Sequence, residues 1–154
     1  MFKVRRAVPE DKEIICEIYA SAARRDAALD EVYLDRLIRA GGVFVAEEAA
    51  RVVGFGSIEV SAAEHVRWLY VLPGRQGGGV GSGLLRRLER VGWEAGLRSI
   101  RLHAAPGAAG FYRRNGYREA TPDEAFGHDH EGVEMLKERE PEHPQDPPAS
   151  LRPS

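Results

Sequence analysis

The residues from Gln76 to Ser82 are the part of the sequence best suited to binding an anion. The run is Gln-Gly-Gly-Gly-Val-Gly-Ser. Backbone N–H groups can approach a phosphate closely where no Cβ intervenes, and glycine also allows the positive φ angles that such a loop requires. An apolar segment, 66–72, precedes the run, and a helical apolar pattern follows it. Strand, glycine loop and helix in this order predict an anion site at the N-terminus of a helix.

Two common phosphate-binding motifs do not fit this loop. The dinucleotide fingerprint G-x-G-x-x-G fails because Ser82 or Leu84 stands where its third glycine belongs, and the usual acidic residue further on is missing. A Walker loop needs a lysine, and none lies in or near the run. We therefore expect the loop to hold a pyrophosphate without the groups for hydride or phosphoryl transfer.

The elements that must position this loop follow from the hydrophobic pattern along the chain. We expect strands at 2–8, 43–46, 52–60, 66–72, 99–104, 117–119 and 133–137, and helices at 12–23, 27–40, 79–95 and 108–114. The three strands 43–46, 52–60 and 66–72 have short connections and predict an antiparallel meander, with the turn of the first hairpin at 47–51. The strand–helix–strand order that follows predicts a parallel, right-handed crossover.

Composition limits the class of protein. The 154 residues fit one domain, and the 22 Lys and Arg residues nearly balance the 24 Asp and Glu residues, so nothing points to nucleic acid or an anionic membrane as a partner. Cys16 is the only cysteine, which excludes an internal disulfide. The sequence shows no signal peptide and no apolar run of about 18 residues. We expect a cytoplasmic protein.

The end of the chain changes character at Pro141. Prolines recur among polar residues from there on, and such a segment cannot bury enough apolar surface to become ordered. We expect a functional domain at 1–140 and a flexible tail at 141–154. The His128-x-His130 pair lies in a polar loop without a further ligand set, so we expect no metal site.

Two motifs resemble those of a known family. The pattern Gln76-x-x-Gly79-x-Gly81, preceded by Leu69-Tyr70-Val71-x-Pro73, resembles the coenzyme A signature of the Gcn5-related N-acetyltransferases (GNAT family). The pattern Ala108-x-x-Phe111-Tyr112-x-x-x-Gly116-Tyr117 is similar to the family's C-terminal motif. The beginning, Val4 to Asp11, and the end, Val133 to Lys137, also resemble the family's opening and closing segments. The resemblance covers roughly residues 3 to 138.

This resemblance implies a fold of the α/β (α+β) class. Its mixed, mostly antiparallel, twisted sheet is flanked by helices and splayed between the two middle strands. The implied activity is transfer of an acetyl or other acyl group from acetyl-CoA directly to a primary amine of a small molecule or peptide. An alternative is a non-catalytic acyl-CoA-binding or regulatory module on the same fold. An unrelated phosphate-binding domain is disfavoured by the Tyr112 motif. A homodimer is compatible with the resemblance.

The resemblance also assigns roles to residues. The cofactor-binding positions are Leu69, Tyr70, Val71, Gln76, Gly77, Gly78, Gly79, Val80, Gly81 and Ser82. The amides of Gly77 to Ser82 hold the pyrophosphate, the strand Leu69 to Val71 pairs with the pantetheine, and the N–H of Val71 stabilises the developing oxyanion. Tyr112 is the implied general acid that protonates the departing thiolate.

The general base remains open at this stage. The incoming amine must lose a proton, and family members use a carboxylate or histidine near the splay. The candidates are Glu59, His65 and Glu64, with His103 as a further one. Two positions depart from the family pattern. Ala105 replaces a frequent asparagine, and Gly77 replaces a basic residue, so phosphate binding would rely on backbone amides and on Arg75 or Arg114.

Overall fold

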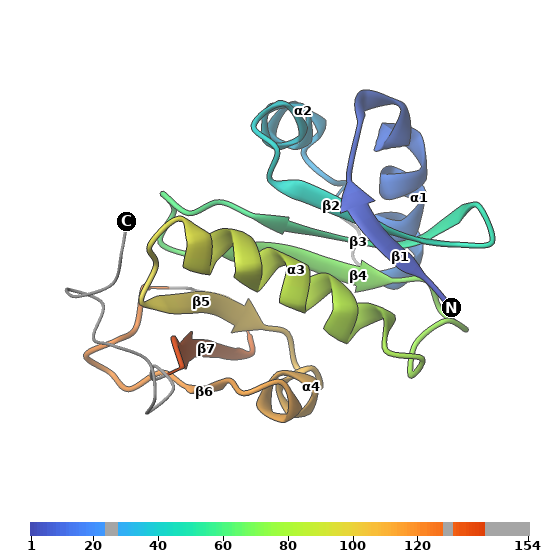
Figure 1. Cartoon of the computed structure of the whole chain (residues 1–154). Coiled ribbons are helices and arrows are strands. Elements are labelled where there is room, and N and C mark those ends of the chain that lie inside the picture. Colours follow the sequence, from blue (N-terminus) through green and yellow to red (C-terminus); the bar gives the residue numbers. More distant parts are fainter. Residues whose placement is uncertain (24–27, 128–130, 141–154) are drawn as a thin grey trace, which may run out of the picture.

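A computed structural model describes residues 1–23, 28–127 and 131–140. Its helices and strands follow one another along the chain around one sheet (Figure 1). They are β1 (Lys3–Arg6), the 3-10 helix η1 (Pro9–Asp11), α1 (Lys12–Ala22), α2 (Glu31–Arg39), β2 (Val43–Glu48), β3 (Arg51–Ile58), β4 (Val66–Val71), α3 (Val80–Glu94), β5 (Ser99–Ala104), α4 (Ala109–Arg114), β6 (Arg118–Glu119) and β7 (Val133–Glu138). None of these helices is long and apolar enough to cross a membrane.

The sheet has seven strands in the order β1-β2-β3-β4-β5-β7-β6. β1 to β4 form an antiparallel meander, β4 and β5 are parallel, and β7 lies between β5 and β6 and is antiparallel to both. The helix α3 connects the two parallel strands. The expected mixed, mostly antiparallel sheet, its meander and its crossover are therefore confirmed.

The sheet opens between its two middle strands. β4 pairs with β3 as far as Val71, but its pairing with β5 is recorded only at Val66 and Leu102. Both strands run from that pair toward the glycine loop, and their described residues form no further pair along the way. They therefore diverge toward the glycine loop. This confirms the predicted splay. The backbone groups of β4 that point toward β5 beyond Val66 are thus left facing a gap.

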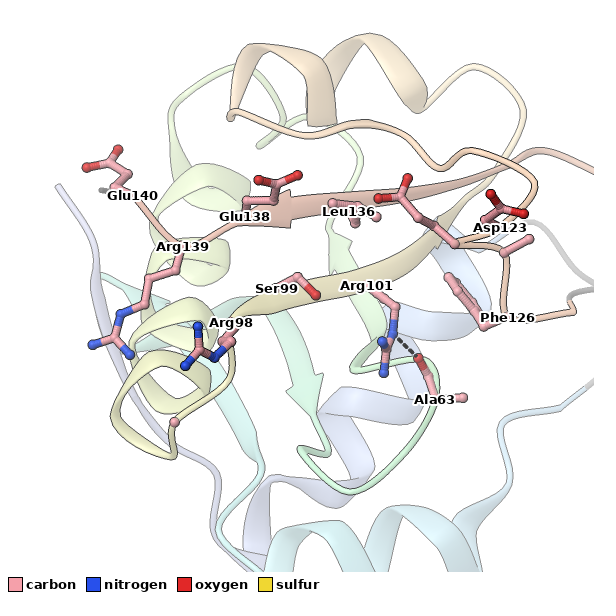
Figure 2. A pocket seen from close by; sticks show the side chains of 13 residues that line it. Ala63, Arg98, Ser99, Arg101, Asp123, Phe126, Leu136, Glu138, Arg139 and Glu140 are labelled. Carbon is pink, nitrogen blue, oxygen red and sulfur yellow. Dashed lines mark hydrogen bonds between the residues drawn. The ribbon is translucent and has the colours of Figure 1, made fainter. Parts of the chain in front are cut away.

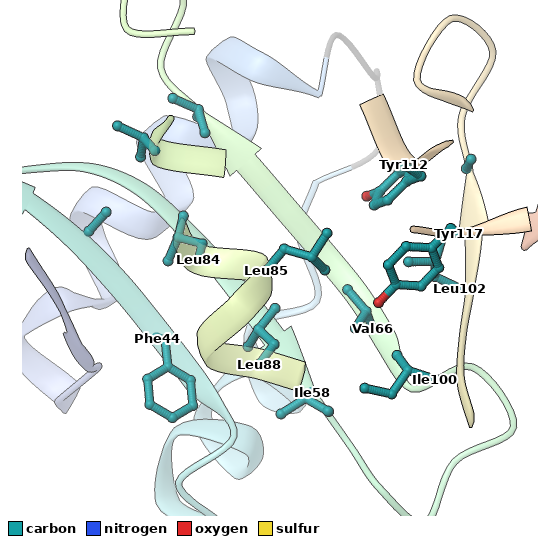
Figure 3. Packing of buried hydrophobic residues seen from close by; sticks show 14 of the residues in the cluster. Phe44, Ile58, Val66, Leu84, Leu85, Leu88, Ile100, Leu102, Tyr112 and Tyr117 are labelled. Carbon is teal, nitrogen blue, oxygen red and sulfur yellow. The ribbon is translucent and has the colours of Figure 1, made fainter. Parts of the chain in front are cut away.

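Helices cover both faces of the sheet, and the alternation along β2 shows how (Figure 1). Phe44 belongs to a buried cluster with α3, whereas Val43 and Val45 belong to a second cluster with α1 and α2. Leu84 and Leu88 of α3 are fully buried in the first cluster, which Figure 3 shows. Each such side chain contributes about 1.5–3 kcal/mol through burial. The two clusters fix α3, and with it the glycine loop, against β4.

Several predicted boundaries are wrong. β1 covers only Lys3–Arg6 of the expected 2–8, and β3 ends at Ile58 rather than at residue 60. Residues 28–30 are not helical, and α2 begins at Glu31 because the Asp30 carboxylate accepts a hydrogen bond from the Tyr33 N–H (3.0 Å) and caps the helix. The first hairpin turns at Ala49 and Ala50, both with positive φ (52° and 65°), rather than over 47–51. A sequence without Asn-Gly at these positions gives little sign of so tight a turn.

Other sequence predictions concern residues that lie outside the described ranges. They are the tail 141–154, the His128-x-His130 pair and the start of the expected helix at Ala27. Among the residues that the structure does describe, no three His, Cys, Asp or Glu side chains come together as a metal site.

Candidate active site

The glycine loop ends at the N-terminus of α3. Gly79 is the N-cap residue with a φ of 84°, and Gly77 has a φ of 89°, conformations that favour glycine. No side chain caps the helix, and its first intrahelical bond runs from the Gly83 N–H to the Gly79 carbonyl (2.9 Å). The N–H groups of Val80, Gly81 and Ser82 therefore have no intrahelical acceptor. They are donors at the positive end of the helix dipole.

A cleft of about 570 Å³ lies over this helix end. We call it the glycine cleft. It is lined by Leu69, Val71, Gln76, Gly77, Gly79, Gly81, Ser82, Ala108, Phe111, Tyr112 and Arg114. A Cβ on Gly81 would stand 3.2 Å from Cζ of Phe111, so the missing side chain lets α4 pack close to α3. Of the remaining predicted cofactor residues, Gly78 is exposed and Val80 is buried in the core.

The backbone of β4 presents alternate residues to the gap. The Leu72 N–H donates to the Val53 carbonyl (2.8 Å), and the register pairs Tyr70 with Phe55 and Val71 with Gly54. Alternate residues of an antiparallel strand point their polar groups to opposite sides. Leu69 and Val71 therefore direct theirs toward the gap with β5, while those of Tyr70 face β3. The Gln76 side chain donates to the Val71 carbonyl (3.2 Å), which ties the loop to this strand.

Two arginines were expected beside the phosphates, and the structure separates them. Arg114, at the end of α4, lines the glycine cleft. Arg75 forms an ion pair with Glu48 at the end of β2 and is not among the lining residues. Arg114 is thus the arginine available to an anion in this cleft.

A second cleft, of about 740 Å³, lies on the side of the sheet that faces α1. We call it the aromatic cleft, because four aromatic side chains line it. The lining residues are Tyr19, Ala22, Ala23, Ala28, Leu29, Asp30, Glu64, Arg67, Trp68, Leu69, Tyr70, His103, Ala105, Pro106, Ala108 and Tyr112. Leu69, Ala108 and Tyr112 line both clefts, so these three residues form the wall where the clefts meet.

Tyr112 is the one member of this wall with a proton to give. Its ring packs edge-on against Phe111 (5.2 Å between centroids) and Tyr117 (5.7 Å), and its side chain is buried. Burial, followed by the negative influence of Tyr70 and Glu64, raises the pKa of the Tyr112 hydroxyl well above its ordinary value. The hydroxyl therefore stays protonated at neutral pH.

A buried polar cluster supports the ring next to Tyr112. The Tyr117 hydroxyl donates to Oε2 of Glu89 (2.9 Å), and Nζ of Lys137 donates to Oε1 of the same carboxylate (3.1 Å). Glu89 lies on α3 and Lys137 on β7, so the cluster connects the helix that carries the glycine loop to the strand beyond the gap. Tyr117 itself lines neither cleft.

Glu59 and His65, two predicted base candidates, line neither cleft. The Glu59 carboxylate accepts a hydrogen bond from the Tyr33 hydroxyl (2.5 Å) and lies 3.7 Å from Nη2 of Arg36. His65 is buried, and its Nδ1 accepts from the Arg101 backbone N–H (3.0 Å). Burial and the Arg101 charge lower the His65 pKa to about 4.

The aromatic cleft instead contains the two other candidates, Glu64 and His103. It also contains Arg67, which the sequence did not single out. One charged residue on a strand has no periodicity that distinguishes a binding role from a solvated surface, so no sequence signal marks Arg67.

A further cleft, of about 1020 Å³, lies at the other end of β5 (Figure 2). Three of its charged groups have partners within the chain. Nε of Arg101 donates to the Ala63 carbonyl (3.0 Å), and Glu124 and Glu138 both form ion pairs with Arg118. None of the predicted site residues lines it. The candidate active site is therefore the pair of clefts that meet at Tyr112.

Comparison with known proteins found one matching family and several solved structures of similar fold. The model of the acetyltransferase (GNAT) domain matches residues 39–119. No curated protein matches the chain by sequence. A GNAT acetyltransferase from Staphylococcus aureus Mu50 has a TM-score of 0.75 at 17% identity, over 90% of this chain and 99% of that one.

Two similar structures were solved with coenzyme A. PaiA N-acetyltransferase from Thermoplasma acidophilum has a TM-score of 0.69 at 18% identity, over 90% of this chain and 99% of that one. Rv2747 from Mycobacterium tuberculosis has a TM-score of 0.72 at 21% identity, over 89% and 99%. These likenesses support the fold, and the family match spans just over half of the sequence. The chain belongs to the GNAT acetyltransferase family.

Proposed function

We propose that the protein transfers an acetyl group from acetyl-CoA directly to the primary amine of a small molecule or peptide. The observation that carries this proposal is that Tyr112 lines both clefts. Direct transfer requires two reactants to meet at one place with a proton donor beside them. The wall formed by Leu69, Ala108 and Tyr112 has this property, with a different chemical lining on each side.

The glycine cleft fits a coenzyme A thioester. The amides of Val80, Gly81 and Ser82 would bind the pyrophosphate at the helix N-terminus, with Arg114 adding a positive charge. The outward-facing backbone of Leu69 and Val71 would bond the pantetheine amides as an added strand does. Coenzyme A in the related structures from T. acidophilum and M. tuberculosis supports this donor.

The acetyl transfer uses residues of both clefts. The N–H of Val71 polarises the thioester carbonyl and stabilises the negative charge that develops on its oxygen. Glu64, from the aromatic cleft, takes the proton that the amine loses as its nitrogen bonds to the carbonyl carbon. The carbon–sulfur bond then breaks, and the Tyr112 hydroxyl gives its proton to the sulfur. The products are the N-acetylated amine and coenzyme A with a free thiol.

Replacement of Tyr112 by Phe tests this proposal. We expect kcat for thiol release, measured with acetyl-CoA and a panel of amines, to fall about 100-fold or more, because a positioned acid contributes about that much. The Kd for coenzyme A should not change. Tyr117→Phe is the matched control, since it removes a neighbouring phenol hydroxyl that lines neither cleft.

The control should keep kcat and lose stability, because the Glu89 carboxylate loses a buried hydrogen bond. Equal losses of kcat in both variants would mean that packing rather than proton donation explains the effect. Tight coenzyme A binding with no thiol release from any amine would favour the alternative of a non-catalytic acyl-CoA-binding module.

A further inference from the structure

A bulge in β4 places Arg67 in the aromatic cleft. Gly56 pairs with Leu69 and Ile58 pairs with Val66, so two residues of β4, Arg67 and Trp68, lie opposite Ser57. The Ser57 hydroxyl accepts the Trp68 N–H (3.2 Å), which compensates for the interrupted ladder. Both bulged side chains therefore line the cleft, where regular alternation would send them to opposite faces.

The Arg67 guanidinium stacks on Tyr33 but has no anionic partner among the described residues. Its Cζ lies 4.9 Å from the centroid of the Tyr33 ring. Within residues 1–23, 28–127 and 131–140, no ion pair or hydrogen bond involves the Arg67 side chain. Stacking occupies the face of a guanidinium and leaves its N–H edge able to bind a carboxylate with two parallel hydrogen bonds.

Arg36 provides an internal comparison. It lies at the same 4.9 Å from the Tyr33 ring centroid, but it contacts the Glu59 carboxylate (3.7 Å) and does not line the cleft. The two arginines share one aromatic platform. They differ in that Arg36 has the Glu59 carboxylate beside it, whereas Arg67 lines the cleft with no ion-pair partner in the part of the chain that the structure describes.

The rest of the aromatic cleft carries the opposite charge and apolar surface. The carboxylates of Asp30 and Glu64 line it and suit an ammonium group, while Tyr19, Trp68 and Leu29 offer apolar contacts. An acceptor with a positive charge alone would be repelled by Arg67. An acceptor with both charges and an apolar body satisfies the whole lining.

We propose that the acceptor is an amino acid, a small molecule that carries a carboxylate as well as the amine, and that Arg67 binds this carboxylate. The proposal rests on the proposed acetyl transfer and names its substrate class. The acceptor's amine forms the bond to the acetyl carbon as the carbon–sulfur bond of acetyl-CoA breaks. The ammonium group releases one proton to solvent before it attacks, and Glu64 receives the second as the carbon–nitrogen bond forms. The sulfur gains a proton from Tyr112, the proton on Glu64 then restores the Tyr112 hydroxyl through solvent, and the acceptor's carboxylate is unchanged. The product is an N-acetyl amino acid.

The test compares acceptors that differ only in this charge. Free L-amino acids and unbranched ω-amino acids from β-alanine to 6-aminohexanoate are each assayed beside their carboxamide. We expect the acids to have the higher kcat/KM. Arg67→Met should raise the KM for the acids about 10- to 100-fold, the amount that a charged hydrogen-bonded pair contributes, and leave the carboxamides unchanged. Arg67→Lys should restore part of the affinity. Arg36→Met, the matched control, should not discriminate acids from carboxamides.

Binding is measured separately, by titrating the coenzyme A-loaded protein with each acid. Acids that bind in an Arg67-dependent manner without being acetylated would uphold the inference and contradict the proposed transfer. Carboxamides acetylated as well as the acids, with no change in Arg67→Met, would overturn the inference and leave the transfer standing. If no acid binds and none is acetylated, the inference is overturned as well.

Discussion

The boundary between β4 and β5 has two ends with different physical chemistry. At the closed end, Val66 pairs with Leu102 and the His65 N–H donates to the Arg101 carbonyl (2.9 Å). At the open end, the polar backbone groups of Leu69 and Val71 face a gap, and the helix that begins beyond it has no side-chain cap. The closed end satisfies its polar groups within the chain. At the open end the Gln76 side chain bonds the Val71 carbonyl, and the other outward-facing groups of Leu69 and Val71 are left for a ligand.

Two adjacent residues, Glu64 and His65, differ in a similar way in whether their side chains can reach a bound substrate. His65 and Glu64 are neighbours in sequence, and both side chains are of types that can accept a proton. His65 uses its Nδ1 inside the closed end, whereas Glu64 lines the aromatic cleft with Tyr112. A proton-transfer group must reach the substrate, so location decides between residues of similar chemical capability.

The largest expected effect tests this pair directly. Glu64→Gln removes the proposed base while preserving shape, and we expect kcat to fall about 100-fold or more. His65→Gln should leave kcat nearly unchanged. Steady-state thiol-release assays of both variants measure the difference, and a larger loss in His65→Gln would identify the histidine rather than Glu64 as the base.

The second effect is on stability at the closed end. His65→Leu leaves the Arg101 N–H without its acceptor, and we expect the free energy of unfolding to fall by about 1–3 kcal/mol. Urea denaturation measures this loss. Unchanged stability would show that the closed end does not depend on the histidine.

The third effect concerns the glycine loop. Gly77→Ala places a side chain at a φ of 89°, a strain of about 1–2 kcal/mol, and we expect the Kd for coenzyme A to rise about tenfold. Gly74→Ala is the matched control, because its φ is 90° and it does not line the glycine cleft. Calorimetric titration of both variants with coenzyme A shows whether the positive φ of Gly77 matters for binding or only for the turn of the chain. A similar loss of affinity in Gly74→Ala would contradict the assignment.

The last effect is a pH dependence. The folded protein lowers the His65 pKa to about 4, below its ordinary value near 6.5, so the unfolded chain binds the proton more strongly. We expect the free energy of unfolding to decrease as the pH falls from about 6.5 to about 4. His65→Gln should show a shallower decrease over the same interval. Parallel acid titrations, followed by circular dichroism, would reveal whether the two slopes differ.

Much of the fold could be predicted from the sequence, because it depends on local patterns. The meander, the crossover and the short helix at Tyr112 all carry hydrophobic periodicity or glycine punctuation. The aromatic cleft could not be predicted, because Arg67 enters it through a bulge whose register is set by β3. The choice among Glu59, His65 and Glu64 was open for the same reason. These side chains acquire different partners only when distant segments meet.

The place of β7 has a consequence for how the protein is made. Among the described residues β7 is the last strand along the chain, yet it lies between β5 and β6 and pairs with both. Its Met135 is fully buried in the core against which α3 packs. A ribosome has therefore released nearly the whole described chain before this half of the sheet can close. The nascent protein therefore exposes an unpaired edge of β5 until β7 has been synthesised.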